Sequence, residues 1–224
     1  MPSKRAQFIL DSIKETVSTN HEELIFLESY KNHWEKWFQV ELATTLKRKE
    51  AKDISLENSN CRFDPRKKNT PSRVQNDFKT AQIDLIFRRK LESRGKLIGI
   101  ELKQAQSLQG IRPMLADIVK INALRRSDWP FREFYFVLFY YEDDKVRRKY
   151  GELLNDLLKD ETILTETMTF PGVNKLQCLI VYWESGPALG KMNIDSFKKW
   201  YSKIEDLLKK YELTKLAKGK TRAS

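Results

Sequence analysis

Three charged residues interrupt apolar segments of the sequence and are the first candidates for chemistry. Asp84 lies within Ala81–Phe87, and Glu101 and Lys103 lie two positions apart in Leu97–Lys103. Because side chains alternate along a β-strand, Glu101 and Lys103 are expected to share one face. Buried charges are costly unless they are paired or bind a metal ion. Carboxylate oxygens are hard ligands that suit Mg²⁺ or Mn²⁺, so Asp84 and Glu101 are candidate metal ligands.

A β-hairpin is predicted to bring these residues together. The patterns of Ala81–Phe87 and Leu97–Lys103 predict two strands. The segment between them, Arg88–Lys96, is highly charged and contains Gly95, which predicts the tip of a hairpin.

An upstream helix supplies a fourth candidate. Apolar spacing predicts a helix over His33–Lys49, and steps of three or four residues from Trp34, Trp37 and Phe38 reach Glu41. Glu41 is therefore expected to face the sheet, whereas Glu35 is expected to face solvent.

The remaining segments complete an α/β pattern. Residues 4–30 are predicted to be helical, and residues 50–79 to form a loop or a short irregular strand. Alternating helices and strands are predicted after the hairpin, at Pro113–Leu124, Phe134–Tyr140, Asp144–Lys159, Leu176–Trp183 and Ile194–Leu213. This order predicts an α/β domain with a central mixed β-sheet flanked by helices. The expected organisation is an N-terminal helical segment (1–33), a main domain (34–214) and a basic flexible tail (215–224).

This pattern resembles the PD-(D/E)XK nuclease superfamily, which includes many restriction endonucleases. The motif reads Ile83-Asp84, sixteen intervening residues, then Glu101-Leu102-Lys103, and the resemblance covers roughly residues 34–140. Glu41 matches the helical glutamate that many members carry. Ile83 stands where the motif has proline, a replacement shared by many members. The resemblance implies a restriction-endonuclease-like core, a central mixed β-sheet flanked by helices.

The resemblance also implies an activity, namely metal-dependent hydrolysis of phosphodiester bonds in double-stranded DNA by a type II restriction-like endonuclease. Mg²⁺, for which Mn²⁺ could substitute, would be held by Asp84, Glu101, the backbone carbonyl of Leu102, and Glu41. The ion would polarise the phosphodiester and lower the pKa of a bound water. Lys103 would orient or deprotonate that water, or stabilise charge on the phosphate. Many such enzymes act as homodimers, so that two sites cut two strands.

The charge balance indicates a polyanionic partner. The chain carries 42 Lys and Arg against 31 Asp and Glu, a formal net charge of +11. Basic clusters would bind a phosphate backbone without reading bases. For the basic residues that end the predicted helix His33–Lys49, favourable interaction with the helix dipole is the alternative explanation. These residues are Lys47, Arg48, Lys49 and Lys52. The candidate nucleic-acid-binding residues are Lys47, Arg48, Arg66, Lys67, Lys68, Arg73, Gln104, Arg125 and Arg126.

Composition excludes several classes of protein. Two Cys and two His make a disulfide scaffold, a four-thiolate zinc site and a His-rich metal centre untenable. The apolar run Phe134–Tyr141 is far shorter than a membrane span, and the N-terminus makes a poor signal peptide, so a soluble, cytoplasmic protein is expected. Cys178, in an apolar strand, is expected to be a core thiol.

Other functions stay open at this point. A DNA-repair or junction-resolving nuclease would use the same core. A non-catalytic nucleic-acid-binding module, or a basic adaptor for a protein or an acidic membrane, would use the positive charge alone.

Overall fold

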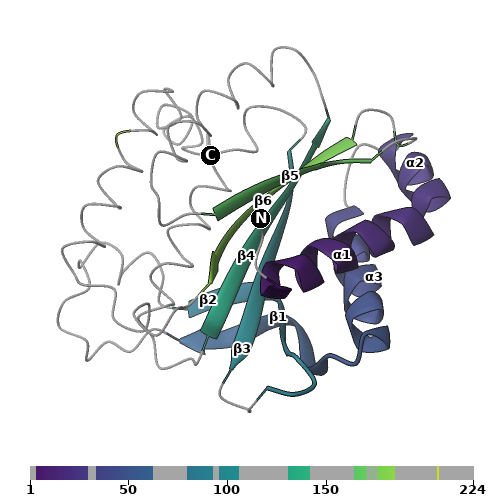
Figure 1. The fold of residues 1–224 in the computed structure, drawn as a ribbon. Helices are drawn as coiled ribbons and strands as arrows, with labels where there is room; N and C mark the ends of the chain where they lie inside the picture. Colours follow the sequence, from purple (N-terminus) through teal and green to yellow (C-terminus); the bar gives the residue numbers. More distant parts are fainter. Residues whose placement is uncertain are drawn as a thin grey trace, which may run out of the picture.

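The chain folds into a six-stranded mixed β-sheet with helices packed against it (Figure 1). The computed structural model describes residues 4–29, 34–62, 80–92, 96–105, 131–141, 164–170, 173, 176–184 and 206. In chain order the elements are α1 (Lys4–Thr19), α2 (His21–Ser29), α3 (Trp34–Arg48), β1 (Lys52–Arg62), β2 (Thr80–Arg88), β3 (Leu97–Ala105), β4 (Phe131–Tyr141), β5 (Leu164–Thr169) and β6 (Leu176–Glu184). The predicted α/β class and mixed sheet are confirmed.

The strand order across the sheet is β1-β2-β3-β4-β6-β5. All neighbouring pairs are antiparallel except β3 and β4, which are parallel. Parallel neighbours need a long crossover connection. Residues 106–130, which make it and which include the predicted helix Pro113–Leu124, lie outside the described residues. The predicted helix Asp144–Lys159 and the tail 215–224 also lie outside them, and of Ile194–Leu213 only Asp206 is described, in a helical conformation.

One strand was predicted only as an alternative to a loop, and another was not predicted. Within residues 50–79, the structure has the strand β1, whose register shifts between Lys52 and Ser55 and again between Asn58 and Cys61. Asp53 has a φ of 54° and Glu57 a φ of 47°, in the left-handed region. Such irregularities break the two-residue alternation that identifies a strand. The other strand, β5, has six residues and, among the described strands, lies at the edge of the sheet beside β6.

The N-terminal helical segment is divided at Asn20, where the sequence predicted one continuous helix. The side-chain amide of Asn20 donates to the carbonyl of Thr16 at 2.8 Å, and the backbone carbonyl of Asn20 accepts the amide of Leu24 at 3.0 Å. A side chain that bonds the preceding turn competes with the continuing helix. The helices α1 and α2 therefore meet at this residue.

The helix α3 ends in a Schellman motif. The amide of Ala51 donates to the carbonyl of Leu46, and the amide of Glu50 to that of Lys47, both at 2.9 Å. Glu50, at the position that usually holds glycine, has a φ of 63°. Ala51 and Leu46 are both buried, as expected for the two apolar positions that accompany this motif. The helix is thus fixed at its C-terminus as it turns into β1.

One face of the sheet packs against α1 and α3, which lie on the same side of it in Figure 1. Residues of α1 (Ile9, Ile13) and of α3 (Phe38, Leu42) join residues of the central strands in one apolar cluster. The cluster includes Cys178, which is fully buried, so the predicted core thiol is confirmed. No described helix is long and apolar enough to span a membrane.

The strand β4 is buried on both faces, as its uninterrupted apolar sequence predicts. Alternate residues Tyr135, Val137 and Phe139 face the cluster under the helices. Phe134 and Phe136, on the opposite face, are also 1% exposed or less. This central strand gives the neighbouring β3 a rigid support.

Candidate active site

The site begins where the pairing between β2 and β3 stops. Their last paired residues are Leu85 and Ile100. Beyond this point β2 stays paired with β1, through Ile83 opposite Asn58, but not with β3. The two central strands therefore separate at one end, and the edge of β3 toward β2 needs other acceptors for its amides.

Two carboxylates take up these amides. Oδ2 of Asp84 accepts the backbone N–H of Leu102 at 2.7 Å, and Oε2 of Glu35 accepts that of Gln104 at 3.3 Å. Leu102 and Gln104 are two positions apart, so their amides point to the same edge of β3. The backbone thus fixes two acidic side chains from different elements beside the same strand edge.

The ammonium group of Lys103 lies between these carboxylates. Nζ is 3.3 Å from Oε1 of Glu35 and 3.9 Å from Oδ2 of Asp84. The side chain of Lys103 is 22% exposed, and those of Glu35 and Asp84 are 31% and 14% exposed. The group is thus partly shielded from water yet reachable from solvent.

Glu101 is the most buried acidic residue of the motif, with 1% of its surface exposed. It precedes Leu102 on β3 and lies on the strand face opposite to Ile100 and Leu102, which belong to the core under the helices. Continuing the β2–β3 register by one step would place it opposite Asp84. The hairpin motif is thus brought together by adjacent strands, with Asp84 and Lys103 in contact and Glu101 beside them in the register.

Burial raises the pKa of the Glu35 carboxyl above its ordinary value. Lys103 opposes this shift, Asp84 adds to it, and the hydrogen bonds from Lys103 and Gln104 oppose it. The direction shows that desolvation outweighs the nearby positive charge.

The expected solvent position of Glu35 is wrong, and the expected role of Glu41 is not supported by a contact. Glu41 is partly exposed and forms no hydrogen bond or ion pair with the described residues. The buried stripe of α3 runs through Trp34, Phe38 and Leu42, whereas Trp37, which also contributed to the predicted register, is only partly buried. Glu35 lies beside this stripe, and its carboxylate reaches Lys103 and Gln104 of β3.

The donor set fits a hard divalent cation. Asp84, Glu101 and the carbonyl of Leu102 lie on adjoining strand positions. No three His, Cys, Asp or Glu side chains converge as a preformed metal cage among the described residues. Mg²⁺ seldom has such a cage, because it keeps several waters and binds through one or two carboxylates together with substrate phosphates.

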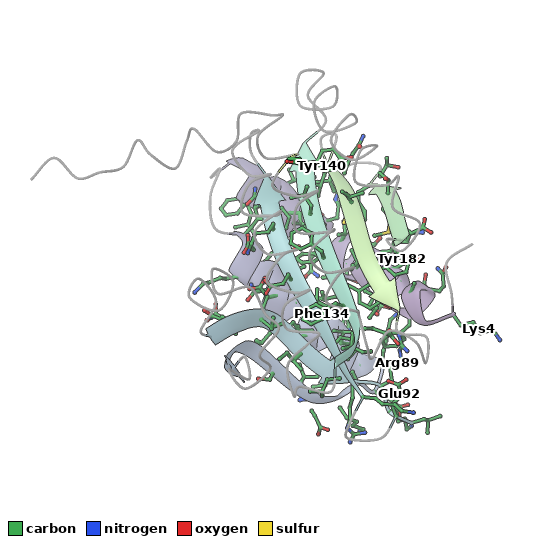
Figure 2. The ribbon with its side chains drawn as sticks, turned by 90° about the vertical axis from the view of Figure 1, so that its left-hand side faces the viewer. Lys4, Arg89, Glu92, Phe134, Tyr140 and Tyr182 are labelled. Atoms are coloured by element: carbon green, nitrogen blue, oxygen red, sulfur yellow. The ribbon has the colours of Figure 1, made fainter. Side chains whose placement is uncertain are left out.

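The hairpin between β2 and β3 lies at the opposite end of the sheet from these residues. In Figure 2, Arg89 and Glu92 lie together at one end and Tyr140, which pairs with Ala105 just beyond the site, lies at the other. Cations of the hairpin have acidic partners: Arg88 with Asp53, Lys90 with Glu50, and Arg89 with Glu133. Much of the hairpin's charge is therefore used within the molecule.

Of the predicted nucleic-acid-binding residues, three are described. Lys47 is exposed, Arg48 bonds the hydroxyl of Thr45 and lies 3.7 Å from Glu15, and Gln104 has its amide held by Glu35. The others, Arg66, Lys67, Lys68, Arg73, Arg125 and Arg126, lie outside the described residues.

The surplus of positive charge in the chain lies outside the described residues. The described residues include 15 Lys and Arg against 17 Asp and Glu, whereas the whole chain has 42 against 31. The site-bearing scaffold is therefore close to neutral, and the basic surplus belongs to the rest of the sequence.

Searches against protein-family models, curated proteins and solved structures found no match.

Proposed function

We propose that this chain is a metal-dependent nuclease that hydrolyses phosphodiester bonds in double-stranded DNA, built on a restriction-endonuclease-like core. The observation that supports it best is the position of the Lys103 ammonium, 3.9 Å from Asp84, at the point where β2 and β3 separate. The buried Glu101 on the same strand face as Lys103 completes the set of two acids and a base. The parallel placement of β4 beside β3 is consistent with such a core.

The residues divide into two roles. Asp84, Glu101 and the carbonyl of Leu102 would hold Mg²⁺ or Mn²⁺. The bound ion supplies Lewis acidity toward a phosphodiester and lowers the pKa of a water molecule. Lys103 orients the attacking water or deprotonates it, and its positive charge also stabilises the charge that develops on the phosphate.

Substrate binding is expected to depend on charge outside the described scaffold. Counterion release from a phosphate backbone gives affinity without base recognition. Each site would cut one strand, so a homodimer would supply the second site for duplex cleavage.

The test is cleavage of supercoiled plasmid and of long linear DNA in Mg²⁺, in Mn²⁺ and in chelator. Wild type and Lys103→Ala are compared, with Lys14→Ala, an exposed lysine of α1, as the matched control. Metal-dependent products that disappear only in Lys103→Ala support the proposal. Discrete bands indicate sequence-specific cleavage, and a smear indicates a non-specific or structure-selective nuclease.

The opposite result is equally informative. If wild type cleaves neither plasmid, linear duplex, a four-way junction nor single-stranded RNA in either metal, the nuclease proposal is overturned. Salt-sensitive DNA binding without cleavage would then identify a non-catalytic binding module.

A further inference from the structure

The first turn of α3 reaches the edge of β3 through one side chain. The carboxylate of Glu35 accepts two hydrogen bonds at 3.3 Å, from Lys103 Nζ on one oxygen and from the Gln104 amide on the other. These donors are consecutive in the sequence but differ in kind, because one is a mobile side chain and the other is fixed backbone. The backbone contact therefore orients the carboxylate that meets the ammonium.

The turn that carries Glu35 is itself well anchored. The neighbouring Trp34 is 2% exposed, and its ring lies 5.0 Å from that of Phe139 in an edge-to-face arrangement. Phe38, one turn later, lies 4.7 Å from the same ring. Phe139 pairs with Gln104 in the β3–β4 register. Helix, strand and carboxylate thus form one packed unit around the end of β3.

The Gln104 amide points toward the side from which β2 has departed. The β2–β3 pairing ends at Ile100, four residues earlier. Asp84 accepts the amide of Leu102 between these points, and Glu35 accepts the next amide on that edge. The two carboxylates thus accept the backbone hydrogen bonds that β2 would accept if its pairing with β3 continued. Lys103 lies between these carboxylates.

We propose that Glu35 is a positioning residue, which closes the open edge of β3 and holds the Lys103 ammonium beside Asp84. Its effect on catalysis rests on the proposed nuclease function, but its effect on the edge of β3 does not. Glu35 acts through Lys103, which is the group that would touch the substrate.

The proposal that Glu35 closes the edge of β3 is tested without metal or substrate, by residue-resolved amide hydrogen exchange. In Glu35→Ala, the Gln104 amide should exchange about fivefold faster, because a hydrogen bond contributes about 1 kcal/mol. The Leu102 amide should keep its wild-type rate. Asp84→Ala should give the reverse result, with Leu102 accelerated and Gln104 unchanged. An unchanged Gln104 rate in Glu35→Ala would overturn the proposal.

The effect of Glu35 on catalysis is tested with Glu35→Gln. This variant keeps an oxygen acceptor for the Gln104 amide but removes the negative charge facing Lys103. If wild type cleaves DNA, this variant should lower kcat by about 10- to 100-fold, as loss of a positioning partner does, with little change in KM. The matched control is Glu57→Gln, which breaks the exposed pair between Lys36 of α3 and Glu57 at 3.0 Å and should keep wild-type kcat.

The outcomes separate the two hypotheses. Wild-type kcat in Glu35→Gln would overturn the positioning role and leave the nuclease proposal intact. Absence of cleavage by wild type would overturn the nuclease proposal, and the exchange rates would still decide whether Glu35 closes the edge of β3.

Discussion

The carboxylate of Asp84 accepts the backbone amide of Leu102 at 2.7 Å, directly beyond the last β2–β3 pair, Leu85 with Ile100. A side chain thus takes the place of a strand carbonyl. This exchange fixes the orientation of Asp84 while its strand stays paired with β1 on the other side. A single residue therefore joins the sheet and faces Lys103.

Replacements of Asp84 should separate its charge from its hydrogen bond. Asp84→Asn keeps an oxygen that accepts the Leu102 amide, and Asp84→Ala does not. Both variants should lower cleavage by about 100-fold or more, because both remove the negative charge. Only the alanine variant should lose about 1–3 kcal/mol of unfolding free energy, the cost of leaving a partly buried amide unpaired. Denaturant unfolding beside cleavage rates measures both; equal stability of the two variants would contradict the structural role.

Gly99 should be intolerant of a side chain. A Cβ at this position would lie 2.5 Å from Cζ of Phe134, which is 1% exposed and pairs with Gly99 in the β3–β4 register. Gly99→Ala is expected to cost about 1–3 kcal/mol of unfolding free energy through overpacking. The double variant Gly99→Ala, Phe134→Leu should be less destabilised than the two single effects combined. Additive effects in denaturant unfolding would show that the two positions do not clash.

Much of the architecture could be predicted because the sequences of the interior strands are almost entirely apolar. Phe134–Tyr140 is a continuous apolar run, and Leu176–Trp183 is apolar apart from Gln177. The strands at these positions, β4 and β6, each have a neighbouring strand on both sides. The sequence left residues 50–79 open between a loop and a short irregular strand, because the bulges and the polar composition of β1 break the alternation. The strand β5 was not predicted because a six-residue edge strand has too few residues to show a clear hydrophobic pattern. Local pattern thus reveals buried strands better than edge strands.

The site was predictable as far as residues share a strand or a hairpin. Asp84 and Lys103 meet because alternation and a hairpin bring them together, which sequence spacing alone indicates. The register built on Trp34, Trp37 and Phe38 does not separate the two glutamates of the helix, because Glu35 and Glu41 each lie three residues from Phe38. In the structure Glu35 contacts Lys103, whereas Glu41 forms no hydrogen bond or ion pair with the described residues. Glu35 was recognisable only from its position between Trp34 and Phe38, the fully packed aromatic residues of α3.

Breaking the buried Arg89–Glu133 ion pair at the hairpin end from one side should destabilise the fold strongly. Arg89 contacts both oxygens of Glu133 at 3.2 and 2.8 Å, and Tyr135 donates to Glu133 at 2.9 Å. Arg89→Ala should lower the unfolding free energy by about 3 kcal/mol, because it leaves the fully buried carboxylate without its counter-ion. Lys90→Ala, which removes an exposed neighbouring pair, is the control and should change stability little. Similar midpoints for the two variants in urea would contradict this difference.

The thiol of Cys178 should be inert in the native protein. Burial raises its pKa well above the ordinary value of 9.0, and the side chain is fully enclosed. Alkylation at pH 8, followed by mass spectrometry of the Cys178 peptide, should show modification only when denaturant unfolds the chain. Rapid labelling of this peptide under native conditions would mean that β6 opens locally.

The pH dependence of stability should carry the signature of Glu35. Burial raises the pKa of its carboxyl above the ordinary value of 4.5, so the folded protein holds this proton more tightly than the unfolded chain does. The contribution of Glu35 to the unfolding free energy is therefore most favourable below the ordinary pKa and falls as the pH rises through the raised one. Lys103 and Asp84 face the group and act in opposite directions on it. Denaturant unfolding of wild type and Glu35→Gln from pH 4 to pH 8 without metal isolates the contribution. The free energy of wild type minus that of the variant should decrease with pH across this window, and an increase would mean that Lys103 outweighs burial.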